Sequence, residues 1–297
     1  MLSHQNTQPE NPVRVVVLGS GGVLGKALLR RLREKDVALL ALRSADVDLQ
    51  EATAADKLQG RLNADDAVVF LSALTPDRGR DVATLMKNLR MAEAVAGAVA
   101  AVKCRHVIYL SSDAVYGFGN GVVDETTPTD PTDLYGMMHK AREVVMMSAV
   151  PAERLAILRC TLVCAADDTH NSYGPNRFRR QAAADGKILL GGEGKETRDH
   201  VFADDVAELV RLALMHRSCG LLNAVSGRSH AFADVARMVA AQFNPPAEVA
   251  FAGGGGRVTH RHFDPTALHQ AFPDFHFRAL EDAIAEVHRR SFGRADG

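Results

Sequence analysis

The sequence predicts an α/β fold in which a doubly wound parallel sheet is joined to a smaller, loop-rich C-terminal lobe. Apolar runs of strand length alternate with stretches of helical periodicity. The first run, residues 13–18, is almost continuously apolar, as expected of a parallel strand buried on both faces. A glycine-rich turn follows it at once and opens a helix. Strands that alternate with helices form right-handed crossovers, which give a parallel sheet covered on both faces.

The other elements of this sheet follow from the same two periodicities. We expect helices over 23–35, 82–102 and 135–148, and strands over 37–42, 67–72, 106–111 and 155–162. Residues 165–200 are rich in Gly, Asp, Asn and Arg, which is typical of a loop-rich lobe that closes over a ligand. Residues 200–217 return to a strand-then-helix pattern, and 219–290 indicate two helices with short strands.

These patterns divide the chain into two parts. Residues 13–165 are expected to form the dinucleotide-binding domain, with 198–217 packing back onto it. Residues 166–197 and 218–292 are expected to form the substrate lobe, and 1–12 and 293–297 to be flexible tails.

Composition excludes several classes of partner. The chain has 297 residues, 46% hydrophobic and 24% charged, with a net charge of −1, so it carries no electrostatic footprint for nucleic acid or an anionic membrane. No apolar run approaches the ~18 residues of a membrane span, and we expect a cytoplasmic protein. The four cysteines form no CxxC pair and no group with His, which predicts buried reduced thiols and no metal site.

The glycine-rich turn indicates a Rossmann-type dinucleotide site. Gly19 allows the tight turn, Gly22 lets the backbone approach a pyrophosphate, and Gly25 lets helix and strand pack closely. The phosphates would lie at the positive end of the helix dipole. The residues expected to complete this part of the cofactor site are Val23, Leu24, Leu71, Ser72 and Ala73.

The end of the second strand predicts which nicotinamide cofactor binds. An acidic residue there would hold the ribose hydroxyls of NAD, but this chain has Arg43 and Ser44. A guanidinium and a hydroxyl suit a 2′-phosphate, which favours NADP over NAD. In the alternative, Arg43 is a solvated charge and Asp46 reaches back to the ribose.

Ser112 and Tyr135 are the predicted catalytic pair. Carbonyl reduction needs a proton on oxygen as hydride reaches carbon, and a Tyr activated by a nearby cation can supply it. Ser112 would hydrogen-bond the same oxygen. His139 lies one helical turn after Tyr135 and is expected to share its face, to contact the cofactor ribose and to carry part of the positive charge.

These motifs together resemble one enzyme family. The glycine turn, the segment 111–117, Tyr135 and the segment 198–206 resemble the extended short-chain dehydrogenase/reductase family, in its NAD-dependent epimerase/dehydratase group, which acts largely on nucleotide sugars. The resemblance is strong over residues 13–217. It implies a nucleotide-sugar substrate and a homodimer formed by the helices 82–102 and 135–148. It also implies roles for Asn88 in cofactor and helix geometry and for a substrate-binding set of Asp113, Asn171, Arg177, Phe178 and Arg198.

Two departures from the family pattern narrow the function. The family sets Lys four residues after the Tyr; here that residue is His139, and Lys140 is rotated about 140° from Tyr135 around the helix axis. Ala114 replaces the second acid of the sugar dehydratases, so dehydration is not expected. Three functions remain: an NADP-dependent reductase or epimerase-reductase of a keto nucleotide sugar, an epimerase that retains NAD, and a weakened member that binds cofactor as a sensor or scaffold.

Overall fold

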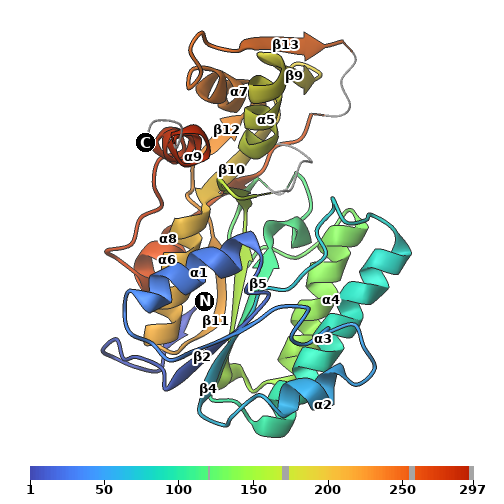
Figure 1. The fold of residues 1–297 in the computed structure, drawn as a ribbon, viewed down its shortest axis with the longest axis vertical. Helices are drawn as coiled ribbons and strands as arrows, with labels where there is room; N and C mark the ends of the chain where they lie inside the picture. Colours follow the sequence, from blue (N-terminus) through green and yellow to red (C-terminus); the bar gives the residue numbers. More distant parts are fainter. Residues whose placement is uncertain (120, 169–173, 254–257, 294–297) are drawn as a thin grey trace.

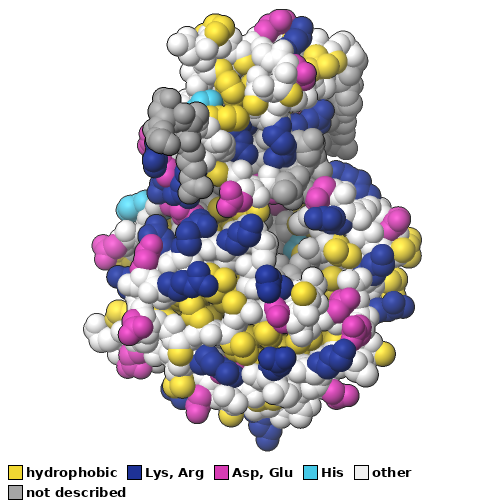
Figure 2. Space-filling model, in the orientation of Figure 1, with side chains coloured by type: hydrophobic (Ala, Val, Ile, Leu, Met, Phe, Trp, Pro, Cys, Tyr) yellow, Lys and Arg dark blue, Asp and Glu magenta, His cyan; other side chains and the backbone are white. Residues whose placement is uncertain are grey.

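A computed structural model describes residues 1–119, 121–168, 174–253 and 258–293. A large lower lobe and a smaller upper lobe meet at a narrower waist (Figures 1 and 2). The lower lobe is built on a seven-stranded sheet, parallel except at one edge, with the order β1-β11-β7-β5-β4-β2-β3. Its strands are β1 (Ser3–His4), β2 (Arg14–Leu18), β3 (Leu39–Leu42), β4 (Asp66–Phe70), β5 (His106–Ser112), β7 (Leu155–Cys160) and β11 (Ser218–Ala224).

Helices cover both faces of this sheet (Figure 1). One face carries α1 (Val23–Arg33), α6 (Ala203–Met215) and α8 (Thr266–Ala271). The other carries α2 (Ala54–Gln59), α3 (Val82–Val102) and α4 (Leu134–Ala149). Val15, Val16 and Val17 are fully buried and alternate between the two cores, as a continuous apolar strand requires. The α/β prediction with a doubly wound sheet is confirmed.

The upper lobe contains three helices and two small sheets. The helices are α5 (Pro175–Asp185), α7 (Phe232–Ala240) and α9 (Leu280–Phe292). The sheets are β8 (Leu162–Cys164) with β10 (Thr197–Phe202) and β12 (Ser229–Ala231), and β9 (Lys187–Gly191) with β13 (Glu248–Ala252). A further pair, β6 (Val122–Val123) with β14 (His262–Phe263), forms a separate sheet that contacts β10, and short 3-10 turns occupy Asp113–Val115 and Ala152–Arg154.

The structure corrects the expected organisation at three places. Residues 218–224, expected in the substrate lobe, form β11 of the central sheet, and the region 219–290 holds three helices rather than two. Residues 1–12 are not a free tail, because β1 pairs with β11 and both ring nitrogens of His4 are hydrogen-bonded, to Ser218 Oγ and Ala271 O (2.8 Å each). The polar composition of residues 1–12 reflects their exposure to solvent and does not indicate disorder. Residues 294–297 lie outside the described residues.

Gly136 sets how closely α4 approaches the turn that follows β5. A Cβ at this position would lie 2.2 Å from the Ala114 carbonyl oxygen, which is backbone and cannot rotate away. Gly97 in α3 is a matched helical glycine whose Cβ would make an ordinary contact, 3.7 Å from the Ala55 Cβ.

We therefore expect Gly136→Ala to destabilise the protein by about 1–3 kcal/mol through overpacking. Gly97→Ala should instead stabilise it by roughly 0.5–1 kcal/mol, because Ala is the better helix former. Urea unfolding of both variants measures the difference. A stabilising Gly136→Ala would contradict the close packing of α4 on this turn.

Candidate active site

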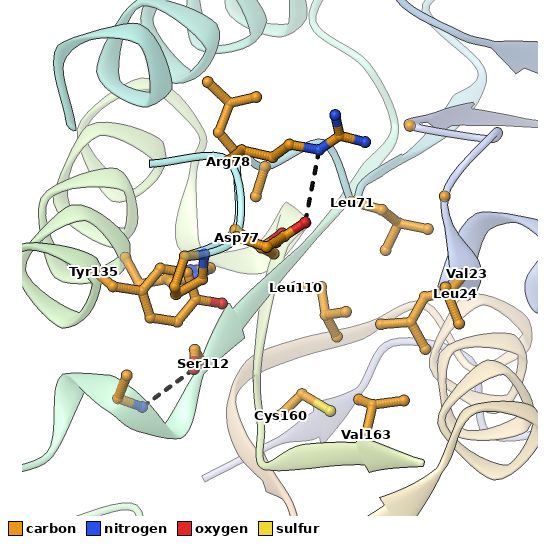
Figure 3. Close-up of a pocket in the computed structure, with 18 of the residues that line it drawn as sticks. Val23, Leu24, Leu71, Asp77, Arg78, Leu110, Ser112, Tyr135, Cys160 and Val163 are labelled. Carbon is orange, nitrogen blue, oxygen red and sulfur yellow. Dashed lines mark hydrogen bonds and ion pairs between the residues drawn. The ribbon is translucent and has the colours of Figure 1, made fainter. Parts of the chain in front are cut away.

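A cleft of about 1060 Å³ lies at the carboxyl edge of the central sheet, beneath the upper lobe. Figure 3 shows its apolar wall, made of Val23, Leu24, Leu71, Leu110, Cys160 and Val163, with Ser112, Tyr135 and Asp77 across from it. Burial raises the pKa of the Cys160 thiol, so Cys160 contributes a neutral, apolar surface to this wall. All four cysteines are free and buried.

Two glycines of the turn, Gly19 and Gly25, leave no room for a side chain. Gly19 has a φ of 89°, and a Cβ there would lie 2.8 Å from the Ser72 amide nitrogen. A Cβ at Gly25 would lie 2.3 Å from the Gly19 carbonyl oxygen. Gly22 is the N-cap of α1, so the first amide groups of this helix open toward the cleft beside Val23 and Leu24. This is a cradle of backbone donors, which is the feature that a pyrophosphate requires.

Two further segments border the cradle. Arg43 and Ser44 are exposed at the end of β3, and the Arg43 side chain passes over Gly21. Asp46 accepts a hydrogen bond from the Arg43 amide (2.8 Å), which lowers the pKa of the Asp46 carboxyl. Both residues that the sequence offered for the adenine ribose therefore lie near each other.

The loop after β4 is held from below by Asn88. The Asn88 Oδ1 accepts from the Leu74 amide (2.9 Å), and its Nδ2 donates to the Leu74 carbonyl (3.1 Å). Asn88 is buried and is not among the cleft-lining residues that the structure describes, whereas Leu71, Ser72 and Ala73 are. Its contacts are those of a residue that shapes the loop.

Helix α4 presents Tyr135 to the cleft. Asp133 caps the helix by accepting from the Gly136 amide (2.8 Å), which places Tyr135 in the first turn. In Figure 3 the Tyr135 ring lies near Ser112, whose Oγ accepts from the Ala114 amide (3.1 Å). A phenol and a hydroxyl thus line the same part of the cleft.

His139 lies one turn further along this face. Its ring meets the Tyr135 ring edge-on, with 4.7 Å between centroids, and its Nδ1 is 2.7 Å from the Tyr109 hydroxyl. His139 is buried, and burial, together with the Arg142 charge, holds its pKa well below the ordinary value. The expectation that His139 carries positive charge is therefore corrected: the imidazole is neutral. Its Nε2 is buried and has no hydrogen-bond partner among the described residues, and the His139 side chain is among those that line the cleft.

Lys140 lies off this face, as the helical geometry predicts. Its Nζ is 3.8 Å from the Glu143 carboxylate, and it is not among the described residues that line the cleft.

The substrate side of the cleft differs from the prediction. Arg198 lines it and stacks over the Phe118 ring at 4.9 Å, and Asp113 lines it as well. Phe178 packs in the core of the upper lobe, because α5 begins at Pro175 and turns this ring inward. The described residues of α5 that line the cleft are Pro175 and Asn176.

Two further substrate positions have different outcomes. Arg177 is half-buried, and it is not among the described residues that line the cleft. Asn171 lies outside the described residues.

Arg261 is a cleft residue that the motifs did not reveal. It is buried, donates to the Asp113 carboxylate (3.1 Å) and to the Tyr116 carbonyl (2.7 Å), and stacks over Phe118 at 4.4 Å. It comes from the segment before β14, which is distant in sequence from every motif, so only folding brings it to Asp113.

The comparisons with known proteins agree with this architecture. Residues 15–223 match the NAD dependent epimerase/dehydratase family, and the chain belongs to that family. A UDP-N-acetylglucosamine 4-epimerase from Bacillus cereus has a similar structure, with a TM-score of 0.81, 20% identity, and coverage of 94% of this chain and 99% of the other. RMD from Pseudomonas aeruginosa, solved with NADPH, has a TM-score of 0.81 and 20% identity, and the match covers 97% of this chain and 100% of the other. A GDP-L-fucose synthetase from Naegleria fowleri, solved with NADP, has a TM-score of 0.81 and 16% identity, and the match covers 98% of each chain.

Among the described residues, no three or more His, Cys, Asp and Glu side chains are grouped to hold a metal ion. None of the described helices is both long and apolar enough to cross a membrane.

The neutral state of His139 generates a prediction about pH. Because its folded pKa lies well below ~6.5, the imidazole should stay neutral from about pH 6 to 9, and activity should show no inflexion from this residue near ~6.5. The unfolded chain binds this proton below ~6.5 and the folded chain does not, so stability is full above that pH and is lost as pH falls.

NMR titration of the His139 ring, assigned by difference from His139→Asn, measures this directly. A constant chemical shift across that range is expected. A midpoint near ~6.5 would contradict the buried, neutral imidazole.

Proposed function

We propose that the protein is an NADP-dependent reductase, or an epimerase-reductase, acting on a keto group of a nucleotide sugar. The observation that carries the proposal is the pairing of Tyr135 and Ser112 opposite an apolar wall, one end of which adjoins the glycine cradle. A reductase needs these parts together: a donor of a proton, a hydrogen-bonding partner for the same oxygen, and a dry surface for hydride transfer.

The residues present fit a nicotinamide dinucleotide. The cradle at Gly19, Gly22 and Gly25 suits the pyrophosphate, Arg43 and Ser44 suit a 2′-phosphate, and the apolar wall suits the nicotinamide ring. When bound, the cofactor supplies or accepts hydride. His139 lines the cleft, and its buried Nε2, which has no partner among the described residues, is the group that would meet a ribose hydroxyl in this proposal.

Tyr135 and Ser112 carry the protein's part of the chemistry. Ser112 Oγ hydrogen-bonds the substrate oxygen and holds it against the Tyr135 hydroxyl, which delivers the proton. Arg198, with Arg261 beside it on the Phe118 ring, offers positive charge to a diphosphate. Ala114, in place of a second acid, favours reduction over dehydration.

Turnover distinguishes the three candidate functions. A reductase oxidises free NADPH in the presence of a nucleoside diphosphate keto sugar; an epimerase interconverts sugars with a cofactor that survives purification; a sensor binds cofactor without turnover. We expect Tyr135→Phe to reduce NADPH oxidation at least 100-fold while leaving cofactor binding within about twofold, since it removes only the proton donor.

Steady-state absorbance at 340 nm measures the rate of NADPH oxidation, and binding titrations measure the affinity for the cofactor. Full activity in Tyr135→Phe would contradict the proposal, as would an unmutated protein that binds NADPH and turns over no keto sugar.

Cofactor preference forms a separate prediction. Arg43 is the group at the cradle that could pair with a 2′-phosphate, and a hydrogen bond to a charged group contributes ~1.5–3 kcal/mol. Arg43→Ala should therefore weaken NADPH binding about ten- to a hundredfold and leave NADH nearly unchanged. Arg237→Ala, an exposed arginine on α7, is the matched control. Equal affinities for NADH and NADPH in the unmutated protein would refute the preference.

We also propose a two-fold homodimer through α3 and α4. These helices lie side by side and expose five apolar side chains, each 46–62% accessible: Val82, Met86, Met137, Val144 and Met147. Met138 and Met146 of α4 are buried within the subunit and do not contribute to this exposed set. An isologous interface would cover the exposed set.

The dimer should be disrupted by Val144→Glu, which would bury two charges at the interface, and not by Val13→Glu, which changes an exposed valine elsewhere. Light scattering at micromolar concentration gives the mass of each. A monomeric unmutated protein would rule the dimer out.

A further inference from the structure

The proposed chemistry requires a positive charge near Tyr135. A tyrosine phenol has an ordinary pKa of about 10, and it is activated near neutrality when a neighbouring cation favours the phenolate. His139 is neutral, and Lys140 lies off the cleft face beside Glu143. Neither residue that the sequence offered supplies this charge.

Arg142 lies on the same face of α4 as Tyr135 and His139, at i+7 and i+3. None of its side chain is exposed. Its Nη2 donates to the Ser72 carbonyl (2.7 Å), and its Nη1 lies 3.4 Å from Asn88 Oδ1. The guanidinium is therefore fixed beneath the loop that borders the cofactor cradle.

The surroundings of Arg142 do not neutralise it. Its hydrogen-bond acceptors are neutral, and aromatic rings flank it, Phe70 at 4.3 Å and Tyr109 at 5.1 Å from its central carbon. Among the described residues it forms no ion pair, since Glu143, its neighbour in sequence, is bound by Arg159 (2.7 Å) and Ser111 (2.7 Å). An unpaired charge in a low-dielectric interior acts over a longer distance than one in water.

We propose that Arg142 is a positioning residue whose fixed positive charge activates the Tyr135 phenol. This inference rests on the proposed role of Tyr135 as proton donor. The Arg142 charge acts on a direct neighbour of Tyr135, because it contributes to the low pKa of His139, whose ring contacts the Tyr135 ring. Burial lowers the pKa of the Arg142 guanidinium, and the Tyr109 and Tyr135 hydroxyls counteract this, as expected when cation and phenols interact.

Other charged groups near Tyr135 differ in position and exposure. They are Asp113 after β5, Asp77, Arg78 and Arg80 in the loop after β4, the α4 N-cap Asp133, Lys140 on α4, and Arg198 and Arg261 from the upper side of the cleft, and His139 on α4 is a titratable but neutral neighbour. Arg78 is the cation labelled in Figure 3, but it is 67% exposed and pairs with Asp77 at 3.7 Å, so solvent screens it. Arg78 is therefore the control position.

The test is a spectrophotometric titration of the Tyr135 phenol in the cofactor-free protein, near 295 nm. The signal is isolated as the difference between each protein and its Tyr135→Phe counterpart. Burial raises the pKa of Tyr109 to about 12 and raises that of Tyr116, so these phenols titrate later.

In the unmutated protein, Tyr135 should titrate below ~10. Arg142→Met should raise the midpoint by about one pH unit or more, a tenfold change in the ionisation constant. Arg142→Lys should keep most of the activation, and Arg78→Met should leave the midpoint nearly unchanged.

A double variant, Arg142→Met with His139→Lys, gives a second test if Arg142→Met alone does not fold. His139→Lys in the Arg142→Met background returns one cation to this face and should restore the low midpoint, whereas His139→Lys alone places two buried cations together and should destabilise the protein.

A midpoint at or above ~10 in the unmutated protein, or a midpoint unchanged in Arg142→Met, would overturn the inference. So would a double variant that titrates near ~10. The experiment uses no substrate, so it separates two failures. A normal titration series without NADPH turnover would refute the proposed function alone, and loss of turnover in Tyr135→Phe with an insensitive midpoint would refute the role of Arg142 alone.

Discussion

The orientation of α4, that is, which of its faces meets the sheet, depends on the buried carboxylate of Glu143. Glu143 accepts from Ser111 on β5 (2.7 Å) and from both Nε and Nη2 of Arg159 on β7 (2.8 and 2.7 Å). Removing one partner of a buried ion pair costs about 3–5 kcal/mol, so this contact strongly fixes which face of the helix meets the sheet. With Glu143 held there, Tyr135, His139 and Arg142 can only face the cleft and the loop above β4.

The same contact separates the roles of two adjacent serines. Successive side chains of a strand point to opposite faces, so Ser111 binds Glu143 while Ser112 reaches the cleft. Arg159 extends the network by donating to the Tyr116 hydroxyl (2.8 Å), which in turn donates to Asn223 on β11. Three parallel strands, the helix and the segment after β5 are thereby joined beneath the site. The upper lobe connects through Arg261, which donates to Asp113 directly after Ser112.

Local patterns predicted the parts of this site that depend on local geometry. The glycine turn and the placement of His139 and Lys140 follow from backbone geometry that neighbouring residues fix. Arg142 and Arg261 were not predicted, because a single arginine gives no signal of its burial, and their partners lie far away in the sequence. Phe178 was misplaced since the start of α5 at Pro175, which decides its direction, was not predicted.

The protonation state of His139 could not be read from spacing either. Helical periodicity gives the direction of a side chain, whereas its charge depends on how much water the packed neighbours exclude. Tyr109, Arg142 and the sheet come together only in the fold. In the function proposed here, His at this position leaves the requirement for charge to another residue, which the motif alone does not identify.

We propose that the cleft is one site for dinucleotide and substrate, with Tyr135 at its reacting end. A crystal structure with bound NADP⁺ tests this arrangement. We expect the pyrophosphate at the amino end of α1 and the nicotinamide ring between the Cys160 and Val163 wall and the Tyr135 hydroxyl. A dinucleotide bound with its nicotinamide away from Tyr135, or bound outside the glycine cradle, would contradict it.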